Sequence, residues 1–178
     1  MAIWRLFKSR WENMHTANGV SHVFMCESAV TAMHSEIRKY RICETGGMLI
    51  GYRRDEQMVI THITGPGPNA RHRLFSFTRD TEFCNQELER LYFQSSGVLT
   101  YLGEWHTHPL GDLYPSAQDS REMRAIATTP SYQTTCPILL LAKIDKRSDG
   151  PVAQCFRYVV NRKISVPEMF ICSDVDIN

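Results

Sequence analysis

The chain has 178 residues, 43% of them hydrophobic, and a formal net charge of +1 at pH 7. This length and composition suit one globular domain, so we expect residues 1–178 to form a single domain. The balanced charge gives no reason to expect nucleic-acid binding, and the longest strongly apolar run, ILLLA from Ile138, is too short to span a membrane. The start, MAIWRLFKSRW, lacks the apolar core of a signal peptide, so we expect a cytoplasmic protein.

The first half of the chain contains both helical and strand-like patterns. Ser28 to Tyr40 has apolar residues at helical spacing and predicts a helix. Gly46 to Arg53 and Met58 to Gly65 flank a charged turn and predict a hairpin. After a Gly/Pro loop, Leu74 to Thr78 predicts a short strand and Asp80 to Ser95 predicts a second helix.

The second half continues this mixture. Leu99 to Pro109 is rich in aromatic residues and ends at a proline, which predicts a strand. Ser116 to Ala127 predicts a helix, and two further strands are predicted at Pro137 to Ile144 and Val152 to Val160. Helices between strands indicate partly parallel pairing, so we expect an α/β fold with helices on one or both faces of a sheet.

A candidate metal site begins with two histidines in EWHTHP. Residues two apart on a strand point to the same face, which places His106 and His108 side by side while Thr107 faces away. Asp119 lies in the first turn of the following helix and can supply the third ligand. The loop from Leu110 to Tyr114 is long enough to fold back over the end of the strand and bring Asp119 to the histidines. Three protein ligands leave the fourth tetrahedral position for water, as in catalytic zinc sites.

Each part of this pattern has an alternative interpretation. An HxH pair alone is a weak metal signal, since histidines also occur in cores and on exposed strands. Ser116 and Asp119 match a helix capping box, which explains both residues without a metal. The combination with the upstream ETGG segment, which contains Glu44, favours a hydrolytic metal site with a second, non-ligating carboxylate.

Together these residues resemble the motif of the JAMM (JAB, MPN-plus) metalloproteases. That motif is a glutamate, then HxHP, then a serine eight residues and an aspartate eleven residues after the second histidine, and the chain matches every position. The resemblance covers about residues 23–160 and implies an MPN/JAB, cytidine deaminase-like domain: a mixed curved β-sheet flanked by helices. It also implies one Zn²⁺ per chain, with these ligands: His106, His108 and Asp119. By the same resemblance, Glu44 is the general base and Ser116 helps to stabilise the oxyanion.

The resemblance implies hydrolysis of the amide bond after the C-terminal tail of a ubiquitin-like or conjugated protein. The overall sequence is most similar to JAB-domain proteins of CBASS anti-phage operons. We therefore expect deconjugation of a cGAS-like nucleotidyltransferase, with neighbouring activating and conjugating enzymes as further partners. The alternatives are a processing protease for a sulfur-carrier or bacterial ubiquitin-like protein and a non-catalytic MPN scaffold. A metallophosphodiesterase is disfavoured, since such sites usually gather more carboxylates and a second metal.

Two other groups of residues have less specific interpretations. None of the six cysteines forms a CxxC motif, so we expect neither a zinc knuckle nor a disulfide framework. Arg71, His72 and Arg73 follow the Gly/Pro loop near the expected active site. They belong either to a solvated face or to the surface that positions a substrate, and the sequence leaves both possibilities open.

Overall fold

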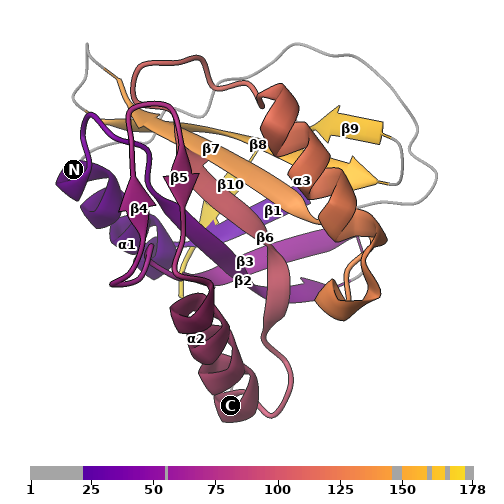
Figure 1. Ribbon diagram of the computed structural model, residues 1–178. Helices are drawn as coiled ribbons and strands as arrows, with labels where there is room; N and C mark the ends of the chain where they lie inside the picture. The colour runs from indigo at the N-terminus through magenta and orange to yellow at the C-terminus, as the bar shows by residue number, and fades with distance from the viewer. Residues whose placement is uncertain (1–21, 55, 146–149, 160–161, 167–168, 175–178) are drawn as a thin grey trace.

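The computed structural model describes residues 22–54, 56–145, 150–159, 162–166 and 169–174, so the start of the chain, on which the signal-peptide expectation rests, lies outside the described residues. The described strands are β1 (His22–Cys26), β2 (Gly46–Arg54), β3 (Gln57–Ile63), β4 (Arg71–His72), β5 (Phe77–Thr78), β6 (Thr100–Thr107), β7 (Ile138–Ile144), β8 (Pro151–Val159), β9 (Arg162–Ser165) and β10 (Met169–Cys172). The helices are α1 (Glu27–Lys39), α2 (Thr81–Gln94) and α3 (Ala117–Thr128), and α3 is followed by a 3-10 turn, Pro130–Tyr132 (Figure 1).

One mixed sheet organises the molecule, with the strand order β10-β1-β3-β2-β6-β7-β8-β9. β6 pairs antiparallel with β2 and parallel with β7, while β1 pairs parallel with both β3 and β10. β4 and β5 form a separate antiparallel hairpin. The expected α/β fold with partly parallel pairing is confirmed. Because β6 has hydrogen-bonded neighbours on both sides, the strand that bears the first histidine is held firmly in the centre of the sheet.

Helices cover both faces of this sheet (Figure 1). Leu140 of β7 belongs to the apolar cluster that contains Met33 of α1, whereas Leu139 and Leu141 belong to the cluster that contains Met123 of α3. Burial on both faces explains why ILLLA is apolar without interruption. Each such side chain contributes about 1.5–3 kcal/mol by leaving water. None of the helices in the described part of the chain has the length and apolar character needed to cross a bilayer.

Most predicted elements are confirmed within one or two residues, with two corrections. The strand predicted at Leu74 to Thr78 is wrong over most of its length, because only Phe77–Thr78 is a strand and the preceding residues form the tip of the β4–β5 hairpin. The tip closes through a hydrogen bond from Arg73 N to Ser76 O at 2.9 Å. The strand predicted to reach Pro109 ends at Thr107, so His108 lies just beyond it. β1, β4, β9 and β10 were not predicted, since strands of at most five residues carry little periodic signal.

Candidate metal centre

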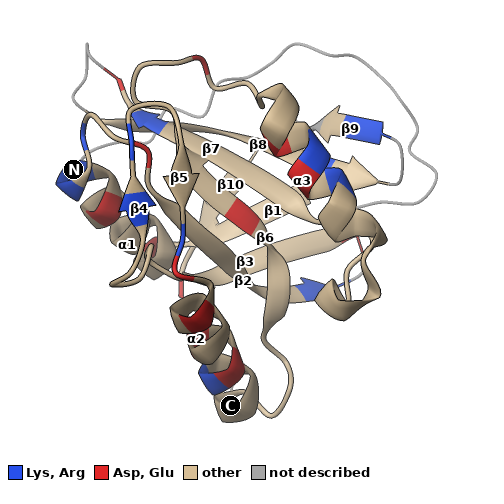
Figure 2. Ribbon diagram, in the orientation of Figure 1, with Lys and Arg blue, Asp and Glu red and all other residues tan. Residues whose placement is uncertain are grey.

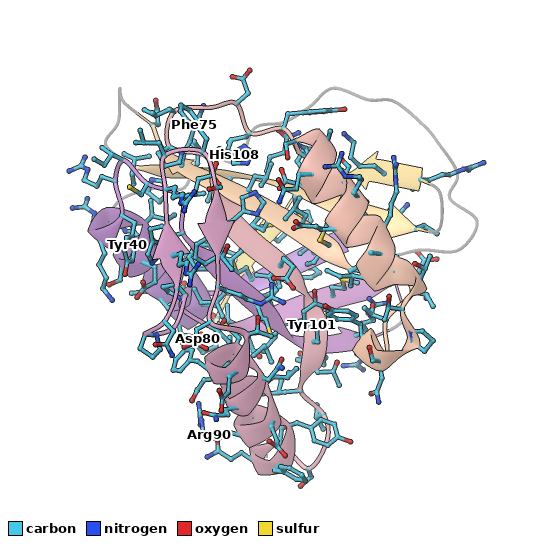
Figure 3. The ribbon with its side chains drawn as sticks, in the orientation of Figure 1. Tyr40, Phe75, Asp80, Arg90, Tyr101 and His108 are labelled. Atoms are coloured by element: carbon cyan, nitrogen blue, oxygen red, sulfur yellow. The ribbon has the colours of Figure 1, made fainter. Side chains whose placement is uncertain are left out.

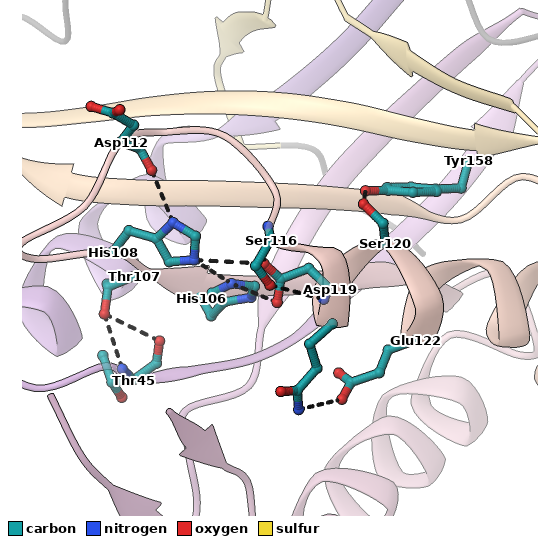
Figure 4. A network of polar contacts seen from close by, with 11 residues as sticks. Thr45, His106, Thr107, His108, Asp112, Ser116, Asp119, Ser120, Glu122 and Tyr158 are labelled. Carbon is teal, nitrogen blue, oxygen red and sulfur yellow. Dashed lines mark hydrogen bonds and ion pairs between the residues drawn. The ribbon is translucent and has the colours of Figure 1, made fainter. Parts of the chain in front are cut away.

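Three side chains point toward one another at the end of β6: His106, His108 and Asp119 (Figure 4). The Nε2 atoms of the two histidines lie 3.1 Å apart, and the Asp119 carboxylate oxygens lie 3.5 Å from His106 Nε2 and 3.7 Å from His108 Nε2. Ligands at about 2.0–2.1 Å from a tetrahedral zinc ion lie roughly 3.3–3.4 Å from one another. The donor set and its spacing therefore fit three corners of a zinc tetrahedron.

His108 lies beyond the strand, and its ring is oriented by the following loop. Its Nδ1 atom lies 2.9 Å from the carbonyl oxygen of Asp112 and donates to it when protonated. In the neutral ring this contact leaves Nε2 as the lone-pair donor that faces the other ligands. Burial lowers the pKa of His108 below its ordinary value, although the bond to Asp112 opposes this effect. A neutral imidazole is the form that binds a metal ion.

Asp119 completes the cap of α3 and also faces the two histidines. Its main-chain N donates to Ser116 Oγ at 3.1 Å, and its Oδ2 accepts from Ser116 N at 2.7 Å, which completes a capping box at the start of α3. The capping interpretation of the sequence is confirmed, yet it leaves Oδ1 directed toward His106. Burial alone would raise the pKa of the Asp119 carboxyl, but hydrogen bonds from His106 and Ser116 and the charge of His106 hold it well below its usual range.

Ser116 lies at the N-terminus of α3, next to the three converging side chains (Figure 4). The residue is exposed, and its hydroxyl accepts the hydrogen bond from Asp119 N. A hydroxyl group can accept and donate at the same time, so its proton stays available to a ligand. The N-terminal end of the helix also favours negative charge, which suits a group that receives an oxyanion.

Glu44 reaches the site from a distant part of the chain. The next residue, Thr45, donates from its N to Thr107 Oγ1 at 2.9 Å and accepts at its O from Thr107 N at 2.8 Å. Because Thr107 lies between the two histidines, this pairing brings Glu44 to the cavity that the three converging side chains line. Burial raises the pKa of Glu44, His106 opposes the rise, and Asp119 adds to it. The raised pKa makes this carboxylate a readier proton acceptor.

The converging side chains open into a groove with a volume of about 660 Å³. Residues of α3 line one wall, and residues 74–77 of the β4–β5 hairpin line the other. Three of its lining side chains are exposed and apolar, and we call them the apolar rim: Leu74, Phe75 and Leu110. Figure 3 shows Phe75 on the same side of the molecule as His108. A groove with an apolar rim can hold an extended peptide beside the metal centre.

A buried ionic network in the groove was missed by the sequence analysis. Arg79 pairs with the carboxylate of Glu104, and the hydroxyl of Tyr101 donates to Glu104 Oε1 at 2.7 Å. Burial raises the pKa of Glu104, and the charge of Arg79 opposes the rise. Figure 2 shows the acidic residue in β6 among largely uncharged central strands. The available signal was that Glu104 precedes His106 by two positions and so shares its face of the strand.

Comparisons with known proteins decide the family. Residues 27–158 match the family model described as prokaryotic homologs of the JAB domain. The chain belongs to this family. The JAB protein is 36% identical over 121 residues to a probable metalloprotease, y4qB, of Sinorhizobium fredii, an alignment that covers 67% of this chain and 74% of the relative. It is 37% identical over 113 residues to a CD-NTase/cGAS isopeptidase of Escherichia coli, covering 62% of this chain and 72% of the relative.

A solved structure confirms the fold of the JAB protein. The solution structure of protein DSY2949 from Desulfitobacterium hafniense superposes with a TM-score of 0.65, at 16% sequence identity, and covers 86% of this chain and 95% of that one. At this identity the likeness concerns the fold alone. The expected MPN/JAB architecture and the resemblance to JAMM metalloproteases are thus confirmed, and membership of this family implies a metal ion.

Proposed function

We propose that the JAB protein is a zinc-dependent isopeptidase that removes a conjugate from the C-terminus of a cGAS-like nucleotidyltransferase. The observation that carries the proposal is the convergence of two imidazoles and a carboxylate at 3.1–3.7 Å, in a groove that Glu44 also lines. The name of the Escherichia coli relative, CD-NTase/cGAS isopeptidase, supports this choice of substrate. In this proposal the zinc ligands are His106, His108 and Asp119.

The chemistry would be hydrolysis of one amide bond. A zinc ion at this site would lower the pKa of a coordinated water toward ~7 and polarise the scissile carbonyl. Glu44 takes the proton from water as the water oxygen joins the carbonyl carbon, and delivers it to the amine nitrogen as the C–N bond breaks. One water is consumed, both of its protons end on the amine nitrogen, and the products are a carboxylate and an ammonium group. Ser116 donates its O–H to the carbonyl oxygen as charge develops there, and losing such a donor typically costs ~100-fold in rate or more.

The groove provides a site for the tail of the substrate. The hairpin wall presents Phe77 of β5 together with Leu74 and Phe75 of the apolar rim, and the opposite wall is α3. An extended tail fits between these walls and can form main-chain hydrogen bonds to the hairpin, in the manner of strand addition. The rim then contacts apolar side chains of the tail, which orients the scissile bond toward Glu44.

Two alternatives make different predictions. A processing protease for a sulfur-carrier or bacterial ubiquitin-like protein would use the same residues on a different tail. A non-catalytic scaffold would be expected to lack one or more of the metal-binding positions, whereas this chain retains all of them. The donor geometry therefore favours an enzyme over a scaffold, and the tail sequence decides between the two proteases.

The test is cleavage of a nucleotidyltransferase that carries a reporter on its C-terminus through an amide bond. We expect the zinc-loaded protein to release the reporter and to leave the native C-terminal carboxylate, identified by mass spectrometry. The matched control is Glu44→Gln, which should keep one equivalent of zinc and lose cleavage. Cleavage of a ubiquitin-like precursor alone would favour the processing alternative. Zinc-loaded protein that cleaves neither substrate, or an E44Q variant as active as the wild type, would refute the proposal.

A further inference from the structure

The main chain of Glu44 is held by the β4–β5 hairpin. Glu44 N donates to Arg73 O at 2.8 Å, and Glu44 O lies 2.9 Å from His72 Nδ1. The next peptide N–H, that of Thr45, donates to Thr107 Oγ1 at 2.9 Å. Because each peptide unit is planar, these contacts fix both planes that meet at the Glu44 Cα, and they thereby fix the direction of its Cα–Cβ bond.

The His72 ring is itself held by two aromatic neighbours. It stacks on Tyr40, which follows α1, with ring centroids 3.8 Å apart and an angle of 11° between the ring planes. Phe77, the cross-strand partner of His72 in the hairpin, lies 5.4 Å away at 36°. Figure 3 labels Tyr40 on the left-hand side of the molecule. The two rings leave His72 little rotational freedom, so Nδ1 stays directed at the Glu44 carbonyl oxygen.

We propose that His72 is a positioning residue for Glu44: its protonated Nδ1 donates to the Glu44 carbonyl oxygen and so aims the carboxylate into the groove. This inference rests on the proposed role of Glu44 as the base. Among the contacts that hold residues 44 and 45 in the described part of the chain, those of His72 and Thr107 involve side chains. The His72 side chain belongs to the hairpin that carries Leu74 and Phe75 of the apolar rim. The hairpin thus links the tail-binding wall to the base through the main chain of Arg73 and the side chain of His72.

The consequence for catalysis follows from the short range of proton transfer. A general base must lie about 2.6–3.2 Å from the proton donor, or one water away. Without the His72 bond, the peptide unit between Glu44 and Thr45 keeps only its contact to Thr107, and the Glu44 side chain gains freedom to leave that range. Losing the bond should therefore lower kcat and leave KM for the tail unchanged.

Two substitutions distinguish the effect of the His72 N–H donor from the effect of its aromatic ring. His72→Phe keeps an aromatic ring against Tyr40 but has no donor, whereas His72→Asn keeps an N–H donor at the Nδ1 position and loses the ring. We expect H72F to lower kcat by about 10-fold, with KM and zinc content unchanged, because misplaced catalytic groups cost rate in this range. H72N should recover at least threefold in kcat over H72F. Equal kcat in H72N and H72F, or wild-type kcat in H72F, would overturn the proposal.

A double-mutant cycle checks that His72 acts through Glu44. In the Glu44→Gln background, H72F should cause no further loss of residual activity, because the base that it positions is already absent. An undiminished tenfold loss in that background would show that His72 acts elsewhere. If H72F fails to fold, the comparison of H72N with the wild type decides: a kcat within about threefold of wild type supports the donor role, and a larger loss contradicts it.

A measurement that does not depend on catalytic activity tests this inference separately from the proposed function. In protein labelled with ¹⁵N-histidine, the NMR signals of His72 should show a protonated Nδ1 at pH 7.5, assigned by their absence from H72N. An unprotonated Nδ1 cannot donate and would refute the positioning role even in a fully active enzyme. Conversely, a protonated Nδ1 in a protein that cleaves nothing would leave the contact intact and refute only the proposed function.

Discussion

Asp119 completes a helix cap and, in the proposed site, also binds the metal, and Asp119→Asn separates these two roles. The asparagine oxygen can still accept from Ser116 N, where Asp119 Oδ2 now accepts at 2.7 Å. The amide nitrogen then takes the place of Oδ1, which lies 3.5 Å from His106 Nε2, and an amide nitrogen is not a metal ligand. We therefore expect D119N to keep the helix start and to lose zinc. The matched variant Ser116→Ala should weaken the start of the helix and keep zinc.

The two variants should differ in how zinc affects their thermal stability. Removing a helix-capping serine costs about 1 kcal/mol, which lowers Tm by about 2–4 °C in a chain of this size. Zinc at 100 times its Kd adds about 2.7 kcal/mol, which raises Tm by roughly 5–11 °C. Metal-free S116A should thus have a lower Tm than the metal-free wild type, and zinc should still raise its Tm. D119N should have a Tm close to that of the metal-free wild type, and adding zinc should not raise it.

The assay is thermal unfolding with and without EDTA, paired with elemental analysis of the purified proteins. Wild type and S116A should each carry close to one equivalent of zinc, and D119N should carry none. A D119N variant that retains zinc and the full rise in Tm would show that Asp119 acts only as a cap. A wild type that folds without taking up any metal would refute the metal centre altogether.

Two further predictions concern stability. Burial raises the pKa of Glu44 in the folded protein, so its favourable contribution is present below the unfolded pKa of about 4.3 and is lost as pH rises through the folded value. At pH 7, metal-free Glu44→Gln should therefore unfold at a higher urea concentration than the metal-free wild type. At pH 4 the two urea midpoints should be equal, and the same difference at both pH values would contradict this reasoning. A Cβ on Gly46 would lie 2.3 Å from Trp105 O, so Gly46→Ala should cost about 1–3 kcal/mol or more. A Cβ on Gly65 would lie no closer than 3.7 Å to its nearest neighbour, so Gly65→Ala should leave the urea midpoint unchanged within error. Equal losses of stability in the two variants would refute the packing argument.

Much of the fold was readable from local patterns. The helix predicted at Ser28 to Tyr40 is α1, and the hairpin around the charged turn is β2 with β3, because periods of 3.6 and 2 residues reflect burial on one face of an element. The positions of the elements in the sheet were not readable, because strand order depends on which apolar faces pack together. For the same reason the tip at Leu74 to Ser76 was mistaken for a strand: apolar residues that form a groove rim have the composition of a buried segment.

The sequence by itself predicted which residues form the candidate centre and which chemistry they are suited to. Two imidazoles, an aspartate at the start of a helix and a distant glutamate are sufficient to predict a hydrolytic metal site, because metal ligation depends on residue type and spacing. Only the tertiary structure decided how these groups are held. The contact between His72 and Glu44 joins residues 28 apart, and that between Thr45 and Thr107 joins residues 62 apart. Such contacts follow from the sheet order and the packing of the hairpin, which no local pattern encodes.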